Sequence, residues 1–376
     1  MKKWILLLIC FGFLLMLVAC SSTTSTPTGT ATAEHSSHDW DSATGICRTG
    51  GELCNHPNGA SEEQHCEICG YAPHFEVITT TDIIDRETVF VRFPEEWKTR
   101  IQECGKFSDF HYSTNAYADY GYENLERTIR VYTPYGYDKD DTETKYNVIY
   151  FIHGNGNSIA TLSSAQMRTV FDNIFFRSDI APCLIVCISY YLDDGKEAAF
   201  DGRDAAHPFL FHEELVKDII PAVESSYNTY LENAEEAGII ASRDHRLISG
   251  YSRGSVCTWN LFHYAFPYFQ FYMPMSADCL GDNHSAALTN EEAYLYLKEA
   301  IDANPNLPFF IYAASGGPQD GAGLREQMKY FVAQTETFSY GTDREVNNIY
   351  YTLADYDHND VYAPYYYFNA LPVFWG

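Results

Sequence analysis

Short apolar runs alternate with segments of helical periodicity along most of the chain, from about Phe75 onward. Continuous runs of about four to eight apolar residues are typical of buried strands, and apolar residues spaced about three to four apart are typical of helices. Strands are expected at Asn147–Ile152, Leu184–Ser189, Arg246–Ser249, Phe269–Ser276, Phe309–Ala314 and Asn348–Leu353. Helices are expected at Ala165–Phe176, Phe211–Tyr230, Ser255–Phe262, Glu291–Ala303, Leu324–Gln334 and Val361–Leu371. This alternation predicts an α/β fold, with a mostly parallel sheet covered by helices on both faces.

Peripheral strands are expected before the first buried strand, within Val77–Phe93 and at Phe107–Tyr117 and Glu126–Tyr132. In the later helix at Phe211–Tyr230, acidic and apolar side chains alternate at helical spacing. We expect its acids to form a solvated face. They are Glu213, Glu214, Asp218 and Glu224.

The N-terminus has the pattern of an export signal. Met1-Lys2-Lys3 is positively charged and is followed by an apolar run to Val18, which predicts a secretory signal, with an uncleaved membrane anchor as the alternative. The run ends in Leu17-Val18-Ala19-Cys20, which resembles the lipobox of bacterial lipoproteins. That resemblance implies a signal peptide over residues 1–20 and lipidation of Cys20. Residues 21–34, rich in Ser, Thr and Ala, are then a flexible tether. We therefore expect an extracytoplasmic protein that meets the membrane only through its lipid.

Net charge and composition limit the classes of partner that the protein is expected to bind. The chain has 376 residues, with 51 acidic against 24 basic side chains and a net charge of −27. This balance disfavours nucleic acid and anionic membrane surfaces. The 30 tyrosines suit a carbohydrate or aromatic ligand, and they are equally explained by a tyrosine-rich core and rim. After residue 74 the length accommodates one large domain over residues 75–376.

A short segment over residues 35–74 is dense in cysteine and histidine. Its Cys66-Glu67-Ile68-Cys69 motif has a spacing at which two thiolates bind one tetrahedral zinc ion. Further ligands are available from Cys47, Cys54, His38 and His56. Two disulfides among the four cysteines are the alternative, because the expected compartment is oxidising. A structural zinc is the one cofactor that the sequence indicates.

The segment Gly250-Tyr251-Ser252-Arg253-Gly254 lies between a predicted strand and a predicted helix. This is the setting of a G-x-S-x-G nucleophile elbow, in which the serine is exposed at a sharp turn. Backbone N–H groups at the start of the helix are then placed to stabilise an oxyanion.

A second group of oxyanion donors is expected in the glycine-rich loop His153–Asn157, which follows a central strand.

A serine nucleophile needs a base, and the base needs an orienting carboxylate. Asp320 and His358 each follow a predicted strand, so they are expected at the edge of the sheet where Ser252 lies. Their order after the serine is that of the α/β-hydrolase triad. Asp278, after the preceding strand, is a rival acid.

Longer stretches carry a family resemblance. They are Val131–Asp138, Tyr146–Gly154, Ile220–Tyr227, Gly238–Arg246, the elbow with Thr258-Trp259, Met273–Ser276 and Ala370–Pro372. From about Lys106 to the C-terminus, the chain resembles the bacterial feruloyl esterases of carbohydrate esterase family one, in particular those attached to xylanases.

The resemblance implies an α/β-hydrolase fold and a triad of Ser252, Asp320 and His358, with no cofactor for catalysis. It implies an oxyanion hole made by the backbone N–H groups of Arg253 and of Gly154 and Asn155. It also implies substrates among plant cell-wall polysaccharide esters or small aryl esters, with Asp278 and Trp259 as candidate substrate contacts. The chain departs from the family at Arg253, where methionine is usual, and at Asn155 and Asn157 in a loop that is usually richer in glycine.

Together these observations predict an extracytoplasmic, lipid-anchored serine esterase, most specifically a feruloyl esterase. An acetyl xylan esterase or general carboxylesterase is the alternative on the same scaffold. A glycan-binding surface lipoprotein without activity is the alternative of another class.

Overall fold

A computed structural model describes residues 38–49, 52–54, 65–81, 83–115, 123–191, 210–281, 288–317 and 320–376. The leader, Cys20 and His56 lie outside these residues, so the predictions for them stay predictions. The chain divides into two compact units, 1–38 and 39–376, and all that follows concerns the second. No described helix is long and apolar enough to cross a membrane.

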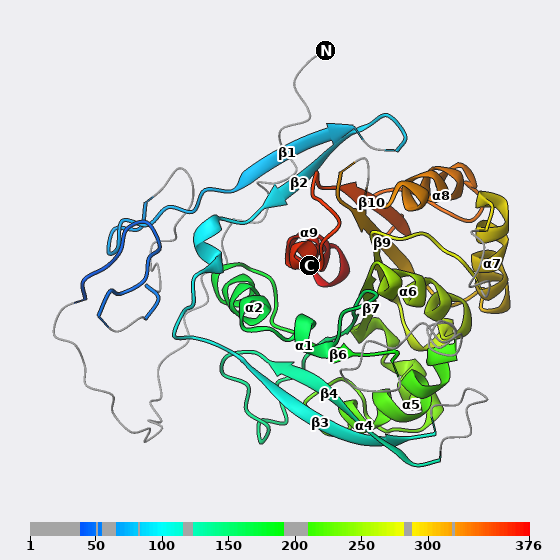
Figure 1. The fold of residues 1–376 in the computed structure, drawn as a ribbon, viewed down its shortest axis with the longest axis horizontal. Coiled ribbons are helices and arrows are strands. Elements are labelled where there is room, and N and C mark those ends of the chain that lie inside the picture. Colours follow the sequence, from blue (N-terminus) through cyan, green and yellow to red (C-terminus); the bar gives the residue numbers. More distant parts are fainter. Residues whose placement is uncertain are drawn as a thin grey trace. The chain divides into compact units, whose positions relative to one another are not determined.

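An eight-stranded sheet forms the centre of this unit, in the order β10-β9-β8-β7-β5-β6-β4-β3 (Figure 1). The strands from β10 to β6 are parallel, and β4 and β3 are antiparallel to their neighbours. Their bounds are β3 Lys106–Thr114, β4 Leu125–Thr133, β5 Val148–Ile152, β6 Leu184–Ile188, β7 Arg246–Tyr251, β8 Phe271–Met275, β9 Phe310–Ser315 and β10 Ile349–Leu353. The mostly parallel α/β architecture predicted from the apolar runs is confirmed.

Helices cover both faces of the sheet. Alternate residues of β5 point to opposite sides, so Tyr150 belongs to one hydrophobic core and Phe151 to the other. The Tyr150 side is covered by α4 Ile220–Glu224, α6 Arg253–Tyr264, α7 Asn290–Ala303 and α8 Ala322–Ala333. The Phe151 side is covered by α2 Ala165–Arg177 and α9 Ala363–Trp375.

Several short elements are too brief for periodicity to predict. They are α1 Ile159–Leu162, α5 Glu236–Ala241, and the 3-10 turns η1 Glu95–Lys98, η3 Arg243–His245, η4 Phe266–Tyr268 and η5 Asp360–Tyr362. The strands expected within Val77–Phe93 form a separate hairpin, β1 Glu76–Thr81 and β2 Glu87–Arg92, whereas the other two expected peripheral strands are β3 and β4 of the central sheet. The Asn369 side chain in α9 binds both the N–H and the carbonyl of Val91 in β2, at 2.9 and 2.8 Å. These contacts fasten the hairpin to α9 (Figure 1).

Two of the four acidic residues expected to face solvent between residues 211 and 230 are buried instead, which corrects the expectation of a solvated acidic face. Glu214 and Glu224 are buried, at 0% and 3% exposed. Arg127 binds Glu214 at 2.5 Å, and Arg246 binds both carboxylate oxygens of Glu224, at 2.6 and 2.8 Å. A guanidinium from a neighbouring strand thus compensates each buried charge.

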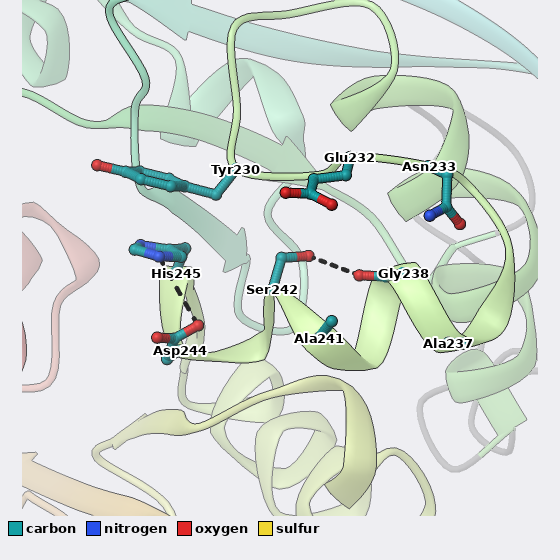
Figure 2. A pocket seen from close by; sticks show the side chains of 9 residues that line it. All are labelled: Tyr230, Glu232, Asn233, Ala237, Gly238, Ala241, Ser242, Asp244 and His245. Carbon is teal, nitrogen blue, oxygen red and sulfur yellow. Dashed lines mark hydrogen bonds and ion pairs between the residues drawn. The ribbon is translucent and has the colours of Figure 1, made fainter.

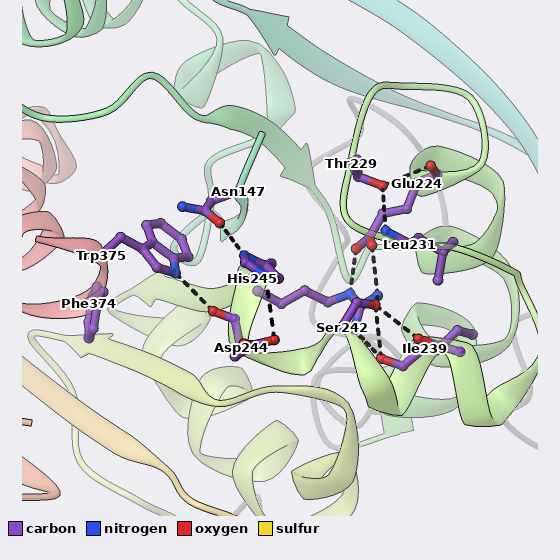
Figure 3. Close-up of polar contacts among 12 residues, drawn as sticks. Asn147, Glu224, Thr229, Leu231, Ile239, Ser242, Asp244, His245, Phe374 and Trp375 are labelled. Carbon is purple, nitrogen blue, oxygen red and sulfur yellow. Dashed lines mark hydrogen bonds and ion pairs between the residues drawn. The ribbon is translucent and has the colours of Figure 1, made fainter. Parts of the chain in front are cut away.

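The helix itself is also shorter than predicted, because it passes through a π-helical turn, η2 Leu215–Ile219, and ends at Glu224. Figure 3 shows the polar contacts that surround Glu224.

Replacing Arg246 by methionine is expected to lower the free energy of unfolding by about 3 kcal/mol or more, because it leaves the buried Glu224 carboxylate without its cation. Urea unfolding followed by circular dichroism measures the change. Lys298→Met is the control, since Lys298 and Asp302 form an exposed pair in α7, and it should barely move the transition. Equal shifts in the two variants would contradict the structural role assigned to the buried pair.

Candidate active site

Ser252 occupies a sharp turn between β7 and α6. Its backbone angles, φ 55° and ψ −116°, lie in a region that non-glycine residues rarely adopt. A Cβ on Gly250 would lie 2.1 Å from the Gly254 carbonyl oxygen, and a Cβ on Gly254 would lie 2.3 Å from that of Ile152. Both glycines are therefore required for the turn to pack, as the elbow motif predicts.

Three side chains from three loops meet at this turn. His358 Nε2 lies 2.9 Å from Ser252 Oγ, and His358 Nδ1 lies 2.5 Å from Asp320 Oδ1. Since a carboxylate only accepts, Nδ1–H donates to Asp320, and Nε2 of the neutral ring accepts the hydroxyl proton of Ser252. The structure thus brings together Ser252, His358 and Asp320 in the arrangement of a nucleophile, a base and an orienting acid.

Asp320 is held from its other oxygen. Its Oδ2 accepts hydrogen bonds from Ser276 Oγ at 2.7 Å and from the Gly316 N–H at 2.5 Å. Ser276, which directly follows β8, has φ 62°. Neither support has a signal in the local sequence, although both residues follow strands at the edge where Ser252 lies.

His358 combines exposure with a buried partner. Its side chain is 48% exposed, whereas that of Asp320 is 2% exposed. The hydrogen bond to Asp320 raises the pKa of His358 above its usual value, partial burial opposes this, and the charges of Asp320 and Asp360 add to it. A base that is accessible to substrate and oriented from behind can exchange a proton with Ser252.

The loop after β5 lies against the nucleophile. A Cβ on Gly154 would lie 3.3 Å from Ser252 Cβ and 3.9 Å from Ser252 Oγ, so this backbone closely approaches the reacting atom. On the other side, Arg253 begins α6, where helix N–H groups have no acceptor within the helix. The residues expected to donate to an oxyanion therefore border Ser252 from two elements.

Of the two candidate substrate contacts, one is buried and the other is partly exposed. Trp259, in α6, is 0% exposed and belongs to the hydrophobic core. Its indole N–H donates to the Ala277 carbonyl at 3.1 Å. The expected substrate contact of Trp259 is corrected accordingly, because a wholly buried ring offers no surface to a ligand. Asp278 is partly exposed, and its carboxylate lies close to Gly323 in the first turn of α8. Burial raises the pKa of Asp278, and His358 pairs with Asp320 rather than with this rival acid.

The cysteine segment contains a cluster of three thiols. The sulfur atoms of Cys54, Cys66 and Cys69 all lie within 4.8 Å of one another, and all three residues are buried. The Sγ atoms of Cys54 and Cys66 are 3.6 Å apart, too far for a disulfide, whose S–S bond is about 2.05 Å. Two sulfurs on one tetrahedral zinc ion are about 3.8 Å apart. The cluster could therefore hold a metal ion, while Cys47 does not belong to it.

One cavity lies away from the triad. It measures about 440 Å³ and is lined by residues that include Tyr230, Glu232, Asp244 and His245 (Figure 2). These residues precede β7, whereas Ser252 follows it, so the cavity opens at the opposite end of the strand. A second cavity of about 250 Å³ lies beside the histidine loop, against Asp360 and Tyr362.

Fold and site together define a serine hydrolase of the α/β-hydrolase class. No family model matches the chain. Among curated proteins, endo-1,4-beta-xylanase Y of Acetivibrio thermocellus is 29% identical over 255 residues, which cover 67% of this chain and 22% of that protein. The chain thus spans about a fifth of the length of this curated relative.

Solved structures show the same fold. A serine-to-alanine mutant of the feruloyl esterase module from Clostridium thermocellum, complexed with sinapinate, has a TM-score of 0.63 and 24% identity, over 80% of this chain and 96% of that one. A ferulic acid esterase from Anaeromyces mucronatus, in complex with ferulic acid, has a TM-score of 0.52 and 15% identity, over 74% and 94%. The α/β-hydrolase fold and the resemblance to feruloyl esterases expected from the sequence are confirmed.

Proposed function

We propose that this protein is a serine carboxylic-ester hydrolase that acts on feruloyl or related esters of plant polysaccharide. The observation that carries the proposal is the hydrogen-bonded chain Ser252–His358–Asp320 at a strained elbow. The likeness to a feruloyl esterase module and to a xylanase supports the substrate class.

The reaction follows from the geometry. Ser252 Oγ attacks the ester carbonyl carbon while His358 Nε2 accepts its proton, and Asp320 stabilises the imidazolium that forms. The N–H groups of Arg253 and of the Gly154–Asn155 loop stabilise the oxyanion of the tetrahedral intermediate. His358 then protonates the departing alcohol oxygen, which leaves an acyl group on Ser252. Water hydrolyses this acyl-serine by the same steps, with His358 again as base.

A substrate panel tests the proposal against its alternatives. The purified protein is assayed on methyl ferulate, feruloylated arabinoxylan, acetylated xylan and an aryl acetate. We expect the highest kcat/KM on the feruloyl esters. A preference for acetyl groups favours an acetyl xylan esterase or a general carboxylesterase. Binding to xylan without turnover of any ester favours the glycan-binding alternative.

We also propose that the thiols of Cys54, Cys66 and Cys69 hold a structural zinc ion. Their burial and mutual distances fit three ligands of a tetrahedral site, and a fourth ligand completes such a site. When bound, zinc would cross-link the backbone at Cys54, Cys66 and Cys69 and so stabilise this segment. The ester chemistry is carried out by the triad and does not involve the metal.

Metal analysis of the purified protein should find about one zinc per chain. Cys66→Ser should lose the metal, whereas Cys104→Ser, outside the cluster, should keep it. Absence of zinc together with oxidised thiols would favour the disulfide alternative.

A further inference from the structure

The side chains of Asn155 and Asn157 anchor the loop after β5. Asn155 Oδ1 accepts a hydrogen bond from the Tyr191 hydroxyl at 3.0 Å. The Asn157 amide donates to Asp360 Oδ2 at 2.6 Å. These residues lie on either side of Gly156, in the loop whose Gly154 borders Ser252.

Tyr191 holds the loop through two of its residues. Its hydroxyl also accepts a hydrogen bond from the Gly156 N–H at 2.9 Å, so one oxygen binds a side chain and a backbone amide together. Tyr191 follows β6, the parallel neighbour of β5, and is 7% exposed. The buried Arg127 donates to the carbonyl oxygens of Ser189 and Tyr191, which fixes the backbone from which the ring projects.

The Asn157–Asp360 contact joins two parts of the site. Asp360 lies two residues after His358 and is 6% exposed, so the bond from Asn157 is largely shielded from water. The loop that supplies backbone donors is thereby tied to the loop that supplies the base. Burial raises the pKa of Asp360, and the bond from Asn157 opposes this.

The orientation of the first peptide in the loop is fixed as well. The Gly154 carbonyl accepts from His153 Nδ1–H at 2.8 Å and from the Asn157 N–H at 3.2 Å. Burial lowers the pKa of His153 to about 4, so the ring is neutral, and its Nε2 accepts from Ser189 Oγ at 2.8 Å. Because a trans peptide places its C=O and N–H on opposite sides, the Asn155 N–H points away from these contacts.

We propose that Tyr191, Asn157 and Asp360 are positioning residues that hold the 154–157 loop in the geometry that stabilises the oxyanion. The inference rests on the proposed esterase function and adds to it a clamp on both sides of Gly156. An oxyanion site works when its donors are fixed before the charge develops, and a displacement of about 1 Å costs up to about 10²-fold in rate. The clamp therefore acts on the transition state more than on substrate binding.

Tyr191→Phe tests the clamp, because it removes one oxygen and keeps the ring. We expect kcat on an aryl ester to fall about tenfold or more, with KM within about twofold of the wild-type value. Affinity for a boronic acid, which forms a tetrahedral adduct with the serine, should fall in parallel with kcat. Asn157→Ala should behave in the same way, and the double variant should lose less than the product of the two single losses, since both act on one loop.

Tyr137→Phe is the matched control. It also removes a hydroxyl that accepts from a backbone N–H, that of Asn228 at 3.2 Å, but at the amino end of β5. It should keep kcat and boronic acid affinity within about twofold of the wild-type values. Urea unfolding midpoints show whether each variant is folded, and Asn157→Ala serves if Tyr191→Phe does not fold.

The outcomes distinguish the proposed esterase function from the proposed positioning role of Tyr191, Asn157 and Asp360. A wild-type protein that hydrolyses no ester overturns the proposed function and the clamp with it. An active wild type whose Tyr191→Phe and Asn157→Ala variants keep kcat and boronic acid affinity overturns the clamp alone. A loss of kcat without loss of boronic acid affinity also overturns it, because the loop would then not act on the tetrahedral state.

Discussion

Ser252→Ala is expected to abolish ester hydrolysis and to leave the fold intact. The serine oxygen forms the bond to the acyl carbon, so its loss should lower kcat/KM by at least about 10⁴-fold. The fold should survive because Ala is smaller than Ser and the turn is set by Gly250 and Gly254. Initial rates on an aryl ester measure the effect, and circular dichroism with urea unfolding reports on the fold.

Ser226→Ala is the control for this result. Its hydroxyl donates to the Ala222 carbonyl at 2.8 Å in the turn after α4, outside the loops that carry the triad. This variant should keep wild-type turnover. A folded Ser252→Ala protein that still hydrolyses esters at the wild-type rate would overturn the assignment of Ser252 as the nucleophile.

Asp320→Asn should lower kcat by about 10⁴-fold and shift the acid side of the pH profile. His358 acts as a base only when neutral, so activity is lost as the pH falls through the pKa of His358. The hydrogen bond to Asp320 raises that pKa in the wild type. With asparagine in its place the pKa falls toward its ordinary value, and the residual activity should persist to lower pH than in the wild type.

Asp357→Asn is the control for the pH shift, because Asp357 is an exposed carboxylate in the same loop, next to His358. It should leave the acid side of the profile near its wild-type position. A collapse of activity in Asp278→Asn, with Asp320→Asn still active, would instead identify the rival acid.

The parallel sheet could be predicted because strands buried on both faces are continuous apolar runs, as in Val148–Ile152 and Leu184–Ile188. The burial of two acids in the helix before β7 could not be predicted, because helical spacing does not say which side of a helix is buried. Glu214 and Glu224 can be buried because Arg127 and Arg246 pair with them from other strands. Such pairing depends on the tertiary structure and not on the local sequence.

The triad could be predicted for a related reason. Ser252, Asp320 and His358 each follow a strand, and parallel strands bring their carboxyl ends to one edge. The supports Ser276 and Tyr191 carry no local signal, because their roles depend on hydrogen bonds across loops. The expected substrate contact of Trp259 is wrong because a tryptophan near the nucleophile has the same sequence context whether it faces the ligand or the core.

Labelling with an aryl phosphonate tests the central claim most directly, because the reagent is attacked by an activated serine and leaves a stable adduct on its oxygen. Intact-protein and peptide mass spectrometry should find one phosphonyl group per chain, on Ser252, with labelling much slower in His358→Ala. A label on another residue, or equal rates in the wild type and His358→Ala, would contradict the mechanism.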